Sequence, residues 1–216
     1  PELKSKTFVE IPLHATFNNK VLGIDEDTRV LVVATLALAD VRDGSQEVTQ
    51  AMTLYGRNAL IWANSDMVGS FITPRADTLR NVVRDPVNRY GAPAQSVLNR
   101  PLSQAATLFN SLSALGLKYQ PDPNLPYSRL KADQVDYVQF PRETLKLRSG
   151  DCDDLSVLLA AAFENLGIES AFVEVPGHLF VMFRTGVKQA DRGLISLQDD
   201  LLVVRGGEIW IPVEAT

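Results

Sequence analysis

The sequence predicts an α+β protein in which a small β-rich part precedes a part built from helices and an antiparallel sheet. Alternating runs of Val, Thr, Phe and Leu fill the first 70 residues, and an apolar stripe of helical period occupies 152–166. Strand-like runs separated by Pro and Gly then follow to the end of the chain. Helices followed by strands, without regular βα alternation, are typical of this class.

Composition narrows the functional classes. The chain has 216 residues, 45% of them hydrophobic, and a formal net charge of −5 with acids and bases interspersed. This content suffices for a continuous core, and the charge pattern predicts no nucleic-acid partner. No apolar run reaches the roughly 20 residues of a membrane span. Because Pro1 stands first, without an initiator methionine or signal peptide, we expect a processed chain or an excised fragment. Membership of a larger polypeptide or envelope assembly is a separate expectation.

The β-rich part is predicted from strands at 7–17 and 28–39, the second of which alternates apolar residues from Val30. The Asp43-Gly44 pair predicts a turn, and one or two further strands follow at 47–62. A helical pattern begins near Pro74 and is expected to break at Asp85-Pro86 and 91–93. These signals predict an accessory domain over 1–90, a packing or partner-binding module without a cluster of catalytic residue types, and a second domain over 91–216.

The second domain is expected to open with a helix from Pro101 to Gly116. A segment rich in proline, 119–139, is predicted to be irregular, and loops of that length are usually functional or mobile. A short helical turn from Pro141 leads into the helix of 152–166. Strands are expected at 170–175, 178–184 and 209–214, with a hairpin inserted over 194–204.

Cys152, the single cysteine of the chain, is predicted to be the first residue of its helix. Asp151 is a suitable N-cap residue, and Asp154 stands where a capping box places its acid. A helix N-terminus favours thiolate, but three neighbouring carboxylates oppose it, so a reactive thiol would need a histidine partner. A lone cysteine can also be a small buried hydrophobe. The polar flanks 149–154 favour the accessible, reactive interpretation.

His178 opens one predicted strand and Glu214 closes the last one. If these strands are antiparallel neighbours, the start of one lies beside the end of the other, and the imidazole meets the carboxylate. Packing of the Cys152 helix on the same sheet would bring the sulfur to the other ring nitrogen.

Three segments resemble the transglutaminase-like cysteine peptidase superfamily over roughly residues 100–216. They are Arg148-Ser149-Gly150-Asp151-Cys152-Asp153-Asp154 with its helix to Leu166-Gly167-Ile168, then Pro176-Gly177-His178, and Trp210-Ile211-Pro212-Val213-Glu214-Ala215-Thr216. The family commonly has Asp where this chain has Glu214. The resemblance implies a papain- or transglutaminase-like core, in which a nucleophile helix packs on an antiparallel sheet.

The resemblance also implies a catalytic triad of Cys152 as nucleophile, His178 as general base and acid, and Glu214 as orienting acid. Gln139 and Tyr119 lie upstream, where the family would place a side-chain oxyanion donor. The implied reaction is acyl transfer through a thioester, with a protein or peptide as substrate. A thiol hydrolase is the first expectation; a cross-linking acyltransferase and a non-catalytic peptide- or cell-wall-binding domain are the alternatives.

No cofactor is predicted. Asp151, Asp153 and Asp154 suggest calcium, but Leu155 occupies the fifth position of the loop and no glycine follows at the sixth. One cysteine and two distant histidines do not predict a structural zinc site. The sequence leaves the compartment open, because one cysteine cannot form an internal disulfide; it favours a bacterial protein in an extracytoplasmic location, periplasmic or secreted.

Overall fold

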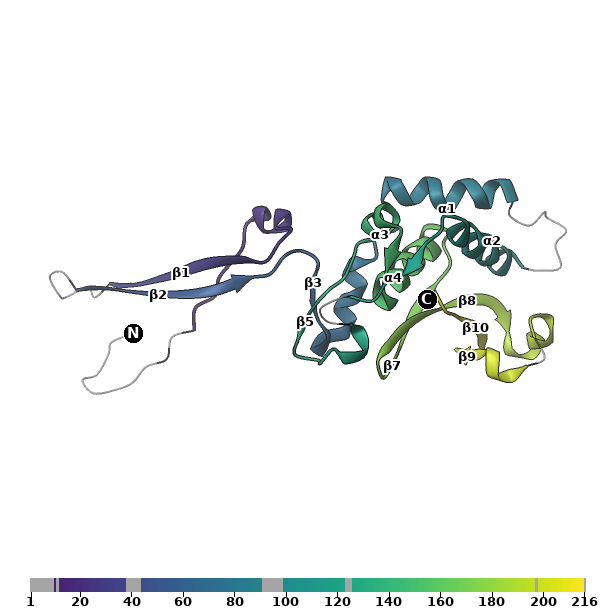
Figure 1. Ribbon diagram of the computed structural model, residues 1–216. Helices are drawn as coiled ribbons and strands as arrows, with labels where there is room; N and C mark the ends of the chain where they lie inside the picture. Colours follow the sequence, from purple (N-terminus) through teal and green to yellow (C-terminus); the bar gives the residue numbers. More distant parts are fainter. Residues whose placement is uncertain are drawn as a thin grey trace. The chain divides into compact units, whose positions relative to one another are not determined.

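The computed structural model describes residues 10, 12–37, 44–90, 99–122, 126–196 and 198–215. The chain divides into two compact units, Pro1–Arg57 and Asn58–Thr216 (Figure 1). The domain boundary predicted from the sequence lies near residue 90, whereas the two units of the structure divide after Arg57. The segment between these two positions belongs to the second unit because it supplies core residues there, among them Leu79 and Val83.

The described residues of the first unit form an antiparallel pair of strands and one short helix. Strand β1 (Thr28–Ala37) pairs with β2 (Ser45–Leu54) along its whole length, from Thr28 opposite Leu54 to Ala37 opposite Ser45. The 3-10 helix η1 (Asn19–Gly23) precedes them. The strand expected at 7–17 is wrong for its described residues, 10 and 12–17, which form none. The Asp43 side of the predicted turn lies outside the described residues.

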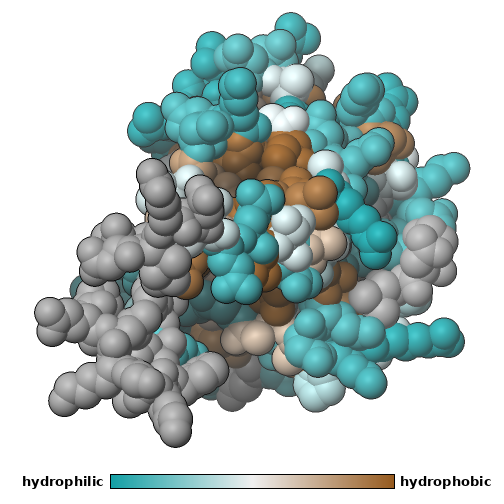
Figure 2. All heavy atoms as spheres, turned by 90° about the vertical axis from the view of Figure 1, so that its left-hand side faces the viewer, coloured by the Kyte–Doolittle hydropathy of each residue, from teal (hydrophilic) through white to brown (hydrophobic). Residues whose placement is uncertain are grey.

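The β1–β2 hairpin leaves many apolar side chains exposed. They come from both strands and include Leu31, Val33, Leu36, Val48 and Met52. Hydrophobic residues are visible among hydrophilic ones on the face that Figure 2 presents. Two strands alone cannot enclose a core, so this exposure follows from the small size of the unit.

The second unit contains all the α-helices of the described chain. Its helical elements are η2 (Trp62–Phe71), α1 (Asp77–Tyr90), α2 (Arg100–Ala114), η3 (Tyr127–Arg129), α3 (Pro141–Leu147), α4 (Cys152–Asn165), η4 (Gln189–Leu194) and η5 (Asp199–Leu201). Its strands are β3 (Ala59–Ile61), β4 (Lys118–Tyr119), β5 (Val135–Tyr137), β6 (Ser149–Gly150), β7 (Ser170–Val175), β8 (His178–Lys188), β9 (Val203–Arg205) and β10 (Glu208–Val213). The α+β class is therefore confirmed.

An antiparallel sheet with the strand order β7-β8-β10-β9 carries the second unit. Helices α1 to α4 lie on one side of this sheet in Figure 1, and α4 and α2 contact β8. The predicted adjacency of the His178 strand and the last strand is confirmed, because β10 pairs with β8 with Val213 opposite Val181. The β9–β10 and β8–β10 pairings make β10 an inner strand.

Helix α4 is the centre of the core. Every residue from Cys152 to Phe163 is buried, so polar and apolar faces alike are covered. Its apolar side packs with α1, α2 and the sheet in a cluster that includes Leu79, Leu108, Leu158 and Val181. Close packing on all sides fixes the position of the helix, and it therefore also fixes the first turn, which contains Cys152.

Two local predictions fail. The helix around Pro86 does not stop there: α1 continues to Tyr90 because Val87, one residue later, is buried in the core and holds the last turn. The hairpin expected over 194–204 is replaced, in the described residues, by η4, η5 and the short strand β9. Among the described residues of that segment, the strand β9 pairs with β10 and not with a strand inside the segment.

Among the described residues, no helix combines the length and the apolar character needed to cross a bilayer.

Candidate active site

Helix α4 begins as the capping-box pattern predicts. The N-cap residue Asp151 has extended backbone angles, and its carbonyl accepts the Leu155 N–H at 3.1 Å. The Asp154 carboxylate accepts the Asp151 N–H at 3.4 Å and the Gln139 N–H at 2.6 Å. Asp154 therefore connects the start of the helix to the segment that follows β5.

Gly150 makes this arrangement possible. A Cβ atom at this position would stand 2.5 Å from the Asp154 Cβ and 2.9 Å from its Oδ2. The backbone of Ser149 and Gly150 is held by the parallel pair β4–β6, in which Tyr119 lies opposite Gly150. Because Gly150 of the Gly-Asp-Cys motif has no side chain, the capping carboxylate of Asp154 can lie close to its backbone.

Cys152 is the first residue of α4, as predicted, but it is 1% exposed. The expectation that its polar flanks keep it accessible is wrong, because those flanks are buried with it. Burial raises the pKa of the thiol to about 12, although the N–H groups of Leu179, Asp153 and Cys152 itself act in the opposite direction. The resting sulfur is therefore a protonated thiol.

His178 and Glu214 meet at the edge of the sheet. His178 Nε2 lies 2.6 Å from Glu214 Oε2, and the two side chains are 31% and 51% exposed. This confirms the contact predicted from antiparallel pairing. With Nε2 engaged by the carboxylate, Nδ1 is the ring nitrogen that remains for another partner. The imidazole also stacks on Phe180, with ring centroids 5.9 Å apart.

The start of α4 lies against the start of β8. The N–H of Leu179, which follows His178 directly, reaches the Cys152 sulfur. One turn further along α4, the Ser156 hydroxyl donates to the Leu179 carbonyl at 3.2 Å. Both backbone groups of Leu179 thus contact the N-terminal part of the cysteine helix. The thiol and the imidazole come from adjoining backbone at this contact.

Tyr119 and Gln139, the predicted oxyanion donors, both lie near the start of α4. Burial raises the pKa of Tyr119, and the neighbouring carboxylates of Asp151, Asp153 and Glu214 add to this rise. Tyr119 is 49% exposed, so its phenol stands at the surface of the site. The Gln139 Oε1 is buried and has no hydrogen-bond partner among the described residues.

Three buried carboxyl groups surround the helix start, those of Asp151, Asp153 and Asp154. Burial raises the pKa of Asp154 to about 8 and that of Asp153 well above its usual range. Neither oxygen of Asp153 meets a donor among the described residues, and its near neighbour is the Asp151 carboxyl group. One shared proton would relieve both the repulsion and the missing hydrogen bond.

Asp151, Cys152 and Asp153 also form a group whose ligand atoms all lie within 4.8 Å of one another. Calcium takes six to eight oxygen ligands and structural zinc takes four nitrogen or sulfur ligands. Two carboxylates and one thiol supply fewer than either ion requires. By themselves, these three residues do not define a metal centre.

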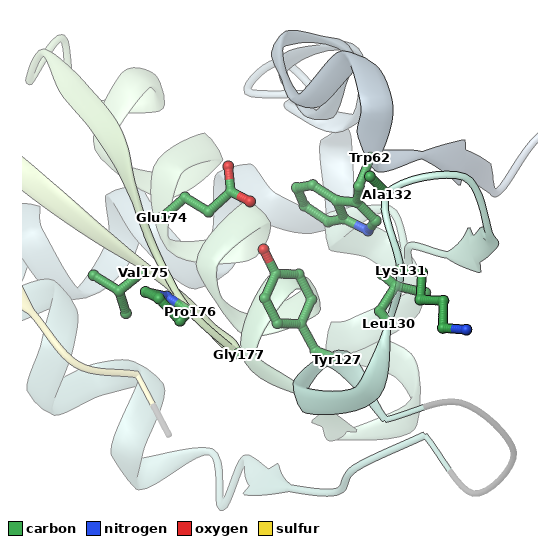
Figure 3. Close-up of a pocket in the computed structure, with 9 residues that line it drawn as sticks. All are labelled: Trp62, Tyr127, Leu130, Lys131, Ala132, Glu174, Val175, Pro176 and Gly177. Atoms are coloured by element: carbon green, nitrogen blue, oxygen red, sulfur yellow. The ribbon is translucent and has the colours of Figure 1, made fainter.

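The sequence did not predict the pocket beside the candidate triad. Its volume is about 390 Å³, and Figure 3 shows its lining. The lining residues are Trp62, Tyr127, Leu130, Lys131, Ala132, Glu174, Val175, Pro176 and Gly177. Only two signals pointed to it: the prolines of 119–139 marked the loop that carries Tyr127, and Pro176-Gly177 marked the turn before His178.

The turn Pro176-Gly177 fixes this wall of the pocket. Val175 pairs with His178, so the two residues between them form a tight hairpin turn, and Gly177 has a φ of 78°. Pro followed by Gly is the preferred sequence of a type II turn. The Ser128 Cα lies 3.5 Å from the position of a Gly177 Cβ, so η3 packs directly on the turn.

The chain has no significant match among protein-family models, curated proteins or solved structures.

Proposed function

We propose that the second unit is a transglutaminase-like thiol enzyme that hydrolyses an amide bond of a protein or peptide. One cluster of contacts carries the proposal. His178 Nε2 lies 2.6 Å from Glu214 Oε2, and the N–H of Leu179, the residue after His178, reaches the Cys152 sulfur. A papain- or transglutaminase-like core is part of the proposal. It is supported by a helix that begins at the cysteine and packs on the antiparallel strand that begins at the histidine.

In the proposed reaction, His178 acts as a general base at the moment of attack. Burial keeps the Cys152 thiol protonated at rest, so the proton moves to His178 Nδ1 as the sulfur bonds to the amide carbon. Glu214 at Nε2 orients the ring and stabilises the imidazolium. The imidazolium then protonates the departing amine as the C–N bond breaks, which leaves a thioester.

Deacylation repeats these roles with water. His178 takes a proton from the attacking water, the acid is released as the C–S bond breaks, and the imidazolium returns a proton to the sulfur. The negative oxygen of each tetrahedral intermediate needs donors in a water-poor site. We assign the Cys152 N–H as one donor and Tyr119 or Gln139 as the candidates for the second.

One observation favours a second candidate function. Cys152 is 1% exposed, so its sulfur is not accessible in the resting site. A peptide- or cell-wall-binding domain without catalysis would not need an accessible sulfur. The enzyme requires an opening that brings substrate to the sulfur. The two functions therefore differ in whether Cys152 ever becomes acylated.

A library of quenched fluorescent peptides, with and without a primary amine, tests the proposal. We expect cleavage by the wild type, an acyl adduct on Cys152 by mass spectrometry, and neither in Cys152→Ala or His178→Ala. Glu164→Gln, an exposed substitution at the far end of α4, serves as the control for charge loss. Incorporation of the amine in place of water would identify an acyltransferase instead, and the absence of any adduct would leave the binding domain.

A further inference from the structure

Two pockets flank the segment that carries His178. The first, of about 390 Å³, is lined at one side by Gly177. The second, of about 290 Å³, is lined by Leu179, together with Ser65, Asp66, Val68, Gly69, Ile72 and Phe172. Trp62 and Glu174 line both pockets. They form the common wall, so a ligand in either pocket lies next to the backbone on one side of His178.

The centre of the first pocket has aromatic walls and one carboxylate. The rings of Trp62 and Tyr127 meet edge to face, with centroids 5.0 Å apart and an interplanar angle of 88°. Figure 3 shows the Tyr127 hydroxyl and the Glu174 carboxylate directed into the space between the two rings and the β7 strand. The Trp62 indole is fixed from behind, where its N–H donates to the buried Asp136 at 2.7 Å.

The Glu174 carboxylate has no hydrogen-bonding or ion-pair partner in the described part of the chain. Its side chain is exposed to the pocket. Lys131 lines the opposite wall, but its ammonium group points away from Glu174 in Figure 3. Asp66 adds a second carboxylate to the neighbouring pocket. The common wall is thus acidic and aromatic.

We propose that the first pocket binds a basic side chain, of the lysine or arginine type, on the substrate. A cation in this position would pair with the Glu174 carboxylate and lie against the faces of Trp62 and Tyr127, and both interactions select positive charge. The inference rests on the proposed function, because it names the substrate class of the same site. It gives the amide hydrolase a preference for peptides with a basic residue beside the cleaved bond.

Binding is tested without catalysis by NMR on the Cys152→Ala protein. The chain has two tryptophans, so its spectrum contains two indole N–H signals, which Trp210→Phe assigns. Trp62 lines the pocket, whereas Trp210 is buried in β10, with Arg205 5.5 Å from its ring. Nα-acetyl-lysine methylamide and its arginine analogue are the probes, and the norleucine analogue has the same shape as lysine without the charge.

We expect the lysine and arginine probes to shift the Trp62 signal saturably and to leave the Trp210 signal in place. Binding of the norleucine probe should be at least tenfold weaker. Glu174→Gln should weaken lysine binding about tenfold, the typical loss of one charge-assisted contact, while Glu164→Gln should not change it. Equal binding of norleucine, tighter binding of the glutamate analogue, or an unchanged affinity in Glu174→Gln would overturn the inference.

The same preference should appear in turnover. On the wild type, a cleaved library peptide with lysine beside the scissile bond should exceed its norleucine counterpart about tenfold in kcat/KM, and Glu174→Lys should reverse the preference toward glutamate. Because the NMR protein lacks the nucleophile, the two hypotheses fail separately. Absence of cleavage with intact lysine binding contradicts only the proposed function, and cleavage without charge preference contradicts only the pocket assignment.

Discussion

Cys152 is subject to two opposing effects at the start of α4. Three backbone N–H groups favour the thiolate, and burial disfavours it. Burial is the larger effect, so the thiol pKa rises from 9.0 to about 12. The sequence indicated the first effect through the helix start. It could not indicate the second, because burial depends on segments that are distant along the chain.

The pH dependence of stability follows from this shift. A thiol pKa that is higher in the folded state than in the unfolded state stabilises the fold fully below about 9, and this contribution disappears as the pH rises toward about 12. We expect the unfolding free energy of the wild type, relative to Cys152→Ala, to fall by up to about 1.4 kcal/mol per pH unit above pH 9. Urea unfolding at pH 8, 9 and 10 measures it. A constant difference would show that the thiol titrates normally.

Glu214 should matter for activity and little for stability. Under the proposed function, Glu214→Ala removes the group that orients His178 and should lower kcat/KM about 100-fold. Glu214→Gln keeps an oxygen that can accept the Nε2 proton and should lose less. Because both partners are substantially exposed, urea midpoints should correspond to changes within about 0.5 kcal/mol. Wild-type kcat/KM in Glu214→Ala would contradict an orienting role.

At the scale of the element, Gly150 determines how α4 begins. Gly150→Ala would force a Cβ to within 2.5 Å of the Asp154 Cβ, so the capping carboxylate must move away. We expect a loss of about 2 kcal/mol in unfolding free energy, from overpacking and the lost cap. Gly69→Ala is the matched control, since nothing lies within 4 Å of its Cβ position. Equal urea midpoints for the two variants would refute the packing argument.

The β7–β8 turn offers a second test. Gly177→Ala and Gly206→Ala each place a side chain at positive φ, 78° and 60°, and each should cost about 1–2 kcal/mol of stability. Gly177 precedes His178 and contacts Ser128, whereas the Gly206 Cβ position is open. Under the proposed function, only Gly177→Ala should also lower kcat/KM beyond its effect on folding. Equal kcat/KM values in both variants, measured at matched folded fractions, would contradict a role of this turn in positioning His178.

Elements with clear boundary residues were predicted well. Gly167, Pro176-Gly177 and Gly206-Gly207 mark the ends of α4, β7, β8 and β10, and these elements occur close to their predicted ranges. Pro86 misled because a proline normally ends a helix, yet here the burial of Val87 outweighs the lost hydrogen bond. Local sequence describes propensity, and tertiary packing decides such cases.

At the scale of the whole molecule, the second unit should fold without the first. Both apolar clusters of the described chain lie within residues 58–216, as do Cys152, His178 and Glu214. We expect a fragment of residues 58–216 to unfold cooperatively in urea. The fragment 91–216, which follows the sequence-predicted boundary, lacks Trp62, Phe71 and Leu79 and should not. Cooperative unfolding of 91–216 would place the boundary back near residue 90.

The candidate site shows which long-range contacts can be predicted from the sequence and which cannot. The contact between His178 and Glu214 was predictable because antiparallel pairing relates strand ends by a simple rule. The pocket was not predictable, because Trp62, Tyr127 and Glu174 come from three separate segments that share no motif. The catalytic roles of Cys152, His178 and Glu214 remain predictions, which the experiments described above test.

The enclosure of Cys152 has a consequence for its redox chemistry. Oxidation to sulfenic and sulfinic acids attacks accessible thiolates, and this sulfur is neither accessible nor ionised at rest. We therefore expect hydrogen peroxide to spare it until the fold opens, so that the chain could persist with a reduced sulfur where exposed thiols are lost.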